Sequence, residues 1–390
     1  MADGRNGTIG IGLAGWAAAV KAAADLTAIR NSQLDGWRAF AVLGVMWLHW
    51  VPAVWRGHFP FEIGLFFFLT LTGFLITRIL LRERTACEEG GGKWHFKAYV
   101  HFQKRRMMRI LVPCYAAMLF AIIVGAPDIR QHWPAYFGHW SNFHMAFMEG
   151  WPSGTAHYWT LAIQVQFYLV WPLVVFLTPR KLLAGVFLGC VALAPVLRMI
   201  LAWRFPEIHH SEMITFTAMD YFGVGALLAL AIDRGMKAGD GRLNLAAMAA
   251  FAGYIVLYVF NEMGRQVAGF CHIQQTLVSV AFAGLISATL AGFGGFREKI
   301  LNHPAVQHVG RLSFGLYLFH TPVPLFLGFV LPWLWFPFFT GFWQILRLGV
   351  FGLTSWGLAW LCWRYLETRP AHGRKCVPAV SAERGASESG

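Results

Sequence analysis

LDGWRAFAVLGVMWLHW, residues 34–50, is the stretch that decides the fold class of this chain. It is apolar enough to enter a bilayer, yet Asp35 and Arg38 lie near its start and His49 near its end. Ionisable side chains are expensive in lipid, so they indicate function. At 100° per residue, Arg38 and His49 fall within about 20° of one helix face, with a rise of roughly 16 Å between them. The stretch predicts a membrane helix with a cation at the membrane boundary and an imidazole near mid-depth.

A second interpretation of this stretch needs no function. Arg38 would then extend its guanidinium toward the membrane surface, and His49 would only hydrogen-bond a neighbouring helix. The stretch alone favours neither interpretation over the other.

The composition places the whole chain in the membrane. Hydrophobic residues make up 57% of the 390 positions, with 34 Phe and 18 Trp, whereas only 13% are charged. Such a chain is far from the average of soluble globular proteins. The net charge of +13 indicates cationic loops that face an anionic cytoplasmic leaflet, and it does not indicate a nucleic-acid partner. We therefore expect an all-α integral membrane protein in contact with the lipid bilayer.

Apolar runs along the chain predict about ten transmembrane helices. Each run is close to the 20 residues that a bilayer requires. The expected spans are residues 37–55, 62–81, 108–125, 157–178, 182–203, 214–232, 243–260, 270–293, 309–333 and 342–365. They form one membrane domain, residues 34–370, between a tail or surface helix over residues 1–33 and a tail over residues 371–390. Lys21 and Asp25 interrupt the early Ala-rich segment, which argues against a secretion signal.

The distribution of Lys and Arg predicts the orientation of these helices. Basic residues gather in alternate connections, above all in an expected cytoplasmic loop over residues 82–106, and the other connections hold few. The basic residues of that loop are Arg82, Arg84, Lys93, Lys97, Lys104, Arg105 and Arg106. Because Lys and Arg accumulate on the cytoplasmic side, both termini are expected in the cytoplasm, with the protein in the cytoplasmic (inner) cell membrane.

Two further groups of residues carry possible chemistry. Arg106 and Arg109 lie three apart on one helix face at the expected cytoplasmic boundary, where their planar guanidinium groups could bind phosphate or only anchor the topology. His320 lies in the ninth expected span at a depth similar to that of His49, so the two imidazoles could share a site. It could also only satisfy a backbone group freed by Pro322.

The one sizeable outer loop, residues 126–156, and the cysteines carry weaker signals. The loop is rich in Trp and His: Trp133, Trp140, Trp151, His132, His139 and His144. Trp could stack on sugar rings but is also enriched at membrane interfaces, and the spacing of the histidines does not define metal ligands. The six cysteines lie far apart and indicate neither a disulfide framework nor a zinc site, so no metal is expected.

Several motifs, in order along the chain, resemble the acyltransferase-3 family over about residues 34–370. They are Asp35-Gly36-Trp37-Arg38-Ala39 with His49; Phe68 to Ile76; Arg106 with Arg109; Trp159-Thr160-Leu161 continuing to Gln166-Phe167-Tyr168 and Trp171-Pro172; Ser313 to His320; and Glu367 near Pro370. The resemblance implies a membrane O-acyltransferase that moves an acyl group, such as acetyl, from cytoplasmic acyl-coenzyme A to a hydroxyl of a cell-surface carbohydrate or glycan.

The resemblance also implies roles for individual residues. His49 is expected to be the general base, with Arg38 and His320 as further catalytic residues. Arg38, Arg106 and Arg109 are expected to bind the phosphates of coenzyme A, the co-substrate. Supporting positions are Asp35, Gln164, Gln166, Tyr168 and Tyr317.

The chain departs from the family pattern at two positions. Gln164 stands where most relatives carry a glutamate in the fourth span, and Phe66 stands at an acidic position of the second span. Gln164 can hydrogen-bond an imidazole but cannot stabilise an imidazolium by charge. An alternative function is a transporter or exporter of a glycan or acylated small molecule, in which the same His and Arg residues line the substrate path. Against it, the sequence contains no repeated half with paired broken helices.

Overall fold

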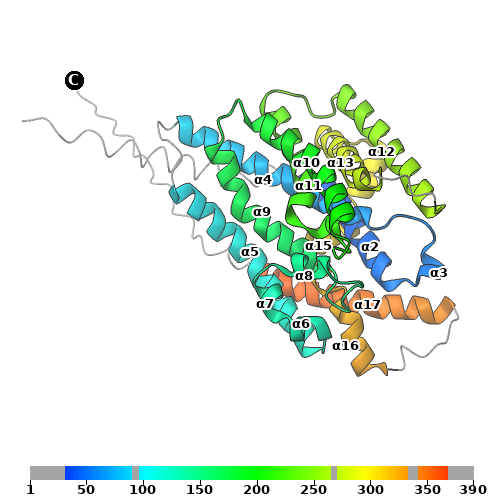
Figure 1. The fold of residues 1–390 in the computed structure, drawn as a ribbon. Coiled ribbons are helices and arrows are strands. Elements are labelled where there is room, and N and C mark those ends of the chain that lie inside the picture. The colour runs from blue at the N-terminus through cyan, green and yellow to red at the C-terminus, as the bar shows by residue number, and fades with distance from the viewer. Residues whose placement is uncertain (1–30, 90–95, 265–269, 333–340, 368–390) are drawn as a thin grey trace, which may run out of the picture.

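The computed structural model describes residues 31–89, 96–264, 270–332 and 341–367, which form helices and no strand. Figure 1 shows α5 and α9 side by side at one edge of the helical bundle and α12 with α13 at the opposite edge. The longer helices are α2 (Ser32–Trp50), α4 (Ile63–Glu89), α5 (Phe96–Ile123), α9 (Tyr158–Leu177), α10 (Leu183–Arg204), α11 (Met219–Asp233), α12 (Gly241–Glu262), α13 (Gln274–Ala291), α15 (Pro304–Phe319), α16 (Pro322–Val330) and α17 (Gly341–Cys362).

Short helices connect these elements. They are α3 (Ala53–Arg56), α6 (Pro127–Gln131), α7 (Trp133–Phe137), α8 (Ser141–Ala146), α14 (Gly295–Leu301), the 3₁₀ helices η2 (Ser211–Met213), η3 (Thr215–Ala218) and η4 (Phe270–Ile273), and the π-helical turn η6 (Trp363–Glu367). Figure 1 shows α6, α7 and α8 together at one end of α5 and α9.

Eight helices in the described part of the chain are long and apolar enough to cross a membrane, or nine if α15 and α16 form one bent span. The described part of the chain is thus all-helical, with the helix lengths and composition of a multi-pass membrane protein. The helix α2 overlaps the first expected span and has 19 residues, but it is not among the eight. Asp35, Arg38 and His49 lower its hydropathy, so length and composition alone do not identify it as a span.

Two expected spans are interrupted where proline intervenes. The first expected span was to reach residue 55, but α2 ends at Trp50 and α3 begins after Pro52. The ninth was to run unbroken over residues 309–333, but α15 and α16 meet at an angle of 68° before Pro322. Proline lacks the N–H that the helix would need at these points. As a result, His49 and His320 lie at helix ends and not in mid-helix.

The connections also differ from the expected loops. The segment 82–106, expected as one cytoplasmic loop, is helical at both ends, because α4 continues to Glu89 and α5 begins at Phe96. The outer loop folds into α6, α7 and α8, with Ile129, Tyr136 and Asn142 completely buried. Of the two expected tails, residues 1–30 and 371–390 lie outside the described residues.

Glycines permit the closest helix contacts in the bundle. On α4 and α11, Gly73 and Gly225 face each other's helix, and an added Cβ would lie 2.3 Å from Phe222 O or 2.2 Å from Thr70 O. On α15, a Cβ at Gly310 would lie 2.0 Å from Asp35 O. No side chain can occupy such a space, so these glycines set the distance between the backbones. The contact at Gly310 fixes α2 against α15 and thereby brings their ends together.

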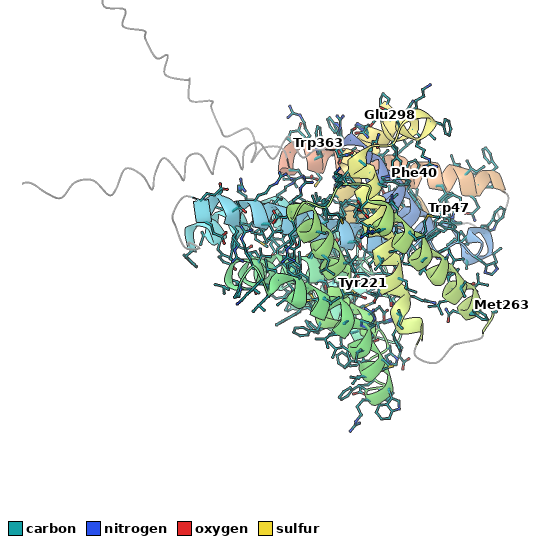
Figure 2. The ribbon with its side chains drawn as sticks, turned by 90° about the horizontal axis from the view of Figure 1, so that it is seen from above. Phe40, Trp47, Tyr221, Met263, Glu298 and Trp363 are labelled. Atoms are coloured by element: carbon teal, nitrogen blue, oxygen red, sulfur yellow. The ribbon has the colours of Figure 1, made fainter. Side chains whose placement is uncertain are left out.

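Apolar side chains cover the outside of the bundle and polar groups are paired within it. Figure 2 shows Phe40 and Trp47 on α2 and Met263 after α12 among the projecting side chains, and each is exposed. Inside, Arg198 of α10 donates from Nη2 to Asp220 Oδ2 of α11 at 2.7 Å, and both residues are buried. The four cysteines whose side chains the structure describes, Cys87, Cys114, Cys190 and Cys362, are free thiols.

Candidate functional site

Three histidines meet where three distant helices end or begin. His49 lies in the last turn of α2, His157 directly precedes α9, and His320 directly follows α15. The ring centroids of His49 and His320 are 5.0 Å apart, and those of His157 and His320 are 4.9 Å apart. The two histidines singled out in the sequence therefore share a site, and His157 joins them.

The break between α15 and α16 explains how this cluster is built. Pro322 has no N–H to donate to Leu318 O, and His157 Nε2 donates to that carbonyl instead, at 3.2 Å. His320 Nδ1 donates to Tyr317 O at 2.7 Å. Both imidazoles thus satisfy backbone carbonyls at the end of α15, as buried polar groups require. The alternative role considered for His320, bonding a freed backbone group, uses only one of its two ring nitrogens.

The three histidines differ in how completely they are bonded. His157 is bonded at both ring nitrogens, because its Nδ1 also shares a hydrogen bond of 2.6 Å with Thr321 Oγ1. His320 is buried, and its Nε2 has no hydrogen-bond partner among the described residues. Since Nδ1 of His320 donates its proton to a carbonyl, the neutral ring carries a free lone pair on Nε2. His49 is exposed and makes no side-chain hydrogen bond with a described residue. Among the described residues, His157 thus has two bonded ring nitrogens, His320 has one and His49 has none.

Residues on α9 and α15 support the cluster from one side. The hydroxyls of Thr160 and Tyr317 are 2.6 Å apart, and Thr160 Oγ1 also donates to His157 O at 2.8 Å. Gln164 follows Thr160 by one helical turn, and its side chain has no hydrogen-bond partner in the described part of the chain. Phe66, at the second departure from the family pattern, stacks on Tyr221 with ring centroids 5.1 Å apart.

A second group of polar side chains contains three arginines: Arg38 near the start of α2, and Arg106 and Arg109 on α5. Arg38 donates from Nη1 to Asp35 Oδ1 at 3.0 Å. Arg106 donates from Nη2 to Tyr168 Oη at 2.9 Å, and its guanidinium lies 4.7 Å from the centre of that ring. These contacts hold two of the guanidinium groups in fixed orientations. They also give Asp35 and Tyr168 a role in orienting the arginines.

Arg109 is the least restrained of the three arginines. Its side chain is exposed and makes no hydrogen bond or ion pair with a described residue. Arg38 and Arg106 are close enough to repel it, and Glu367, at the end of η6, is close enough to attract it. A group of cations with one carboxylate has excess positive charge. The arrangement can bind an anion such as phosphate by charge-assisted hydrogen bonds.

Sequence reasoning placed some residues well and missed others. Gln166 does not bond the cluster of His49, His157 and His320. Its Nε2 donates to the backbone carbonyl of His139 at 2.7 Å and to Asn142 Oδ1 at 2.9 Å, which fixes α9 to the segment around α8. His157 was missed. The signal for it was its position two residues before Trp159-Thr160-Leu161, the motif in the first turn of α9.

Comparison of the sequence with known families identifies one that matches most of the chain. A family model described as an acyltransferase domain, Acyl_transf_3, matches residues 31–365. The chain belongs to this acyltransferase family. The matched residues run from the cap of α2 to η6, so they include both the arginine group and the histidine cluster.

Curated relatives are similar to this chain at moderate identity. Peptidoglycan O-acetyltransferase OatA of Listeria monocytogenes is 27% identical over 322 residues, which cover 74% of this chain and 49% of the relative. Putative peptidoglycan O-acetyltransferase YrhL of Bacillus subtilis is 26% identical, with 74% and 48% covered. O-acetyltransferase OatA of Staphylococcus aureus is 27% identical, with 76% and 51% covered. The chain thus spans about half the length of these relatives. No solved structure matches it.

Proposed function

We propose that this chain is a membrane O-acetyltransferase that moves an acetyl group from cytoplasmic acetyl-coenzyme A to a hydroxyl of a cell-envelope glycan. The observation that carries the proposal is the shared helix α2, which holds Arg38 at one end and His49 at the other, roughly 16 Å apart. Around the first lie Arg106 and Arg109, and beside the second lies His320. The names of the relatives support acetyl as the group and peptidoglycan as the acceptor.

The donor would bind at the arginine group. Arg38, Arg106 and Arg109 offer several N–H donors to the phosphates of coenzyme A, and Arg109 is free to turn toward them. The pantetheine arm would then extend along α2 toward the histidines. The thioester would reach His49, which is exposed and unbonded.

At the histidines, the acceptor hydroxyl would attack the thioester carbonyl. A neutral hydroxyl is a poor nucleophile, and His49 would take its proton as the new C–O bond forms and the C–S bond breaks. The proton would then pass from His49 to the departing thiolate, so that the products are the acetyl ester and free coenzyme A thiol. His320 Nε2 would accept the N–H of His49 and thus hold its other nitrogen free to act as base.

A route through an acyl-histidine is open as well, because His320 is a second base beside His49. Trapping a labelled acyl group on the protein, lost in His49→Ala, would favour that route over direct transfer.

The proposed topology has ten spans, with α2 as the first, both termini in the cytoplasm and the protein in the cytoplasmic membrane. The excess of Lys and Arg in alternate connections supports it. The test places single cysteines in a cysteine-free background and adds a membrane-impermeant thiol reagent from outside. A cysteine near Lys93 should be protected, and a cysteine near Gln131 should react. The reverse pattern would overturn the orientation and the side on which the donor binds.

The decisive test of function uses purified protein in detergent with labelled acetyl-coenzyme A and peptidoglycan fragments or a soluble polysaccharide. Release of free thiol together with transfer of label to the glycan is the expected result. His49→Ala is the matched control and should show neither. A protein that binds no acetyl-coenzyme A would instead favour the transporter or exporter.

A further inference from the structure

A second cluster of ionisable side chains lies away from the acyl-transfer site, in the segment between α5 and α9. Asp128 comes from α6, His132 is the residue between α6 and α7, and His144 comes from α8. One nitrogen of each histidine and an oxygen of Asp128 all lie within 4.8 Å of one another. The spacing of the histidines in the sequence did not define such a group, because Asp128 joins them only in the folded protein.

Two distances within this cluster are close to those between ligand atoms in a metal site. His132 Nδ1 is 3.0 Å and His144 Nε2 is 3.1 Å from the same oxygen, Asp128 Oδ1. In a tetrahedral zinc site with bonds of about 2.0–2.1 Å, ligand atoms are separated by roughly 3.3 Å. Small movements of the side chains would therefore bring all three atoms around one ion. The two rings already lie with their centroids 4.3 Å apart.

The carboxylate is also held as metal-binding carboxylates are. Tyr136 Oη donates a short hydrogen bond to Asp128 Oδ2, the oxygen that the histidines do not contact. Tyr136 is completely buried, and its hydroxyl is also 3.0 Å from Thr155 Oγ1. Metal ligands are usually oriented by such second contacts. Here that contact fixes the aspartate while the opposite oxygen remains available.

We infer that Asp128, His132 and His144 bind one divalent transition-metal ion, with Zn²⁺ the ion that best fits two imidazoles and one carboxylate. The side chain of His132 is 45% exposed, so an ion can enter and water can complete the coordination. The bound ion would join α6 to α8. Through Tyr136 and Thr155 it would also stabilise the start of α9, where His157 lies two residues further on. This inference goes beyond acyl transfer and does not depend on it.

The test measures metal on the full chain in detergent, after removal of any affinity tag. Zinc content after dialysis should be about one ion per chain, and titration against a chromophoric chelator should give the affinity. His132→Ala and His144→Ala should each lose stoichiometric zinc. Tyr136→Phe, which keeps all three ligands, should weaken binding by about 10- to 100-fold. His209→Ala, which removes an exposed histidine outside the cluster, is the matched control and should bind as the unmodified protein does.

Two measurements identify the ion's surroundings and keep the inference open to refutation. Co²⁺ in place of Zn²⁺ should give the strong visible absorption of a tetrahedral site, and X-ray absorption should show two imidazole ligands. Mg²⁺ and Ca²⁺, which prefer oxygen ligands, should not compete. Absence of stoichiometric zinc in monodisperse protein, or equal zinc in all variants, would overturn the inference. The three side chains would then form a hydrogen-bonded cluster only.

Discussion

Arg198 and Arg109 are both arginines of long apolar helices, yet their surroundings are opposite. Arg198 is 1% exposed and donates to both oxygens of Asp220, at 3.2 and 2.7 Å, and to His272 O at 3.1 Å. Thr276 Oγ1 completes the pair by donating to Asp220 Oδ2 at 2.5 Å. Arg109 is exposed and makes no hydrogen bond or ion pair with a described residue.

The difference separates a polar group that is bonded within the fold from one that is open to the ligand of the proposed function. A buried charge costs several kcal/mol unless it is paired and hydrogen-bonded, and Arg198 meets that condition within the protein. Arg109 is exposed, so water solvates its charge and its N–H groups are accessible to a ligand. The histidines show the same contrast, because both nitrogens of His157 are bonded whereas those of His49 are free. Substitutions at bonded and unbonded groups should therefore have different effects.

Replacing the free histidine should have the largest effect. His49→Ala removes the proposed base and should lower transfer by about 10²- to 10⁴-fold. Because its side chain bonds no described residue, the thermal unfolding temperature should change little. Rates are measured with labelled acetyl-coenzyme A, and unfolding is followed by tryptophan fluorescence. Near-normal turnover in this variant would remove His49 from the mechanism.

Breaking the satisfied ion pair should instead destabilise the protein. Arg198→Leu leaves Asp220 buried without its partner and should cost about 3–5 kcal/mol of stability. Arg198→Leu with Asp220→Leu removes both charges and should recover part of the loss. Thermal unfolding in detergent measures both, with Arg109→Leu as the matched control that should retain its stability. A stable Arg198→Leu protein would contradict a structural role for the pair.

Removing either arginine of α5 from the proposed donor site should weaken donor binding without unfolding the protein. Arg106→Ala or Arg109→Ala each removes a charge-assisted contact worth about 1.5–3 kcal/mol, or roughly ten- to over a hundredfold in affinity. Lysine should recover part of the loss, since it keeps the charge but not the planar fork. The two changes should be less than additive, because they share one ligand. Calorimetry with acetyl-coenzyme A is the measurement, and unchanged affinity in both variants would make the pair a topology anchor.

The smallest expected effect is on the pH dependence of stability, and it comes from buried His139, in the segment between α7 and α8. Burial lowers the pKa of His139 from the ordinary 6.5 to about 4. Between these values the unfolded chain binds a proton that the folded chain does not, so stability falls as the pH drops below about 6.5. The loss from pH 7 to pH 6 should be roughly 0.5–1 kcal/mol.

His139→Asn tests this pH dependence. Residue 139 has a positive φ of 57°, which asparagine tolerates. The variant should therefore fold and lose its share of the pH dependence, measured as the difference in unfolding temperature between pH 7 and pH 6. An unchanged slope would assign the pH dependence to other groups.

Some of the site could be predicted from the sequence because its motifs are local. Asp35 with Arg38 and Arg106 with Arg109 lie one helical turn apart, so helix geometry alone places each pair on one face. The common depth of His49 and His320 was also predictable from two spans running in the same direction. Their final positions were not, since Pro52 and Pro322 end the helices and set where each imidazole lies. Neither was His157, which enters the site through a carbonyl freed 161 residues away in the chain.

What the sequence by itself determined is the class of the protein and its family. Apolar runs of about 20 residues must form helices in a membrane, because unpaired backbone groups cannot remain in lipid. The motifs named the family that the comparison confirmed. Only the tertiary structure decided which polar groups are satisfied and which are free. Arg198 pairs with Asp220 on the next long helix, and Asp128 pairs with His144 on another short helix. No local sequence pattern encodes these contacts, because each joins two different helices.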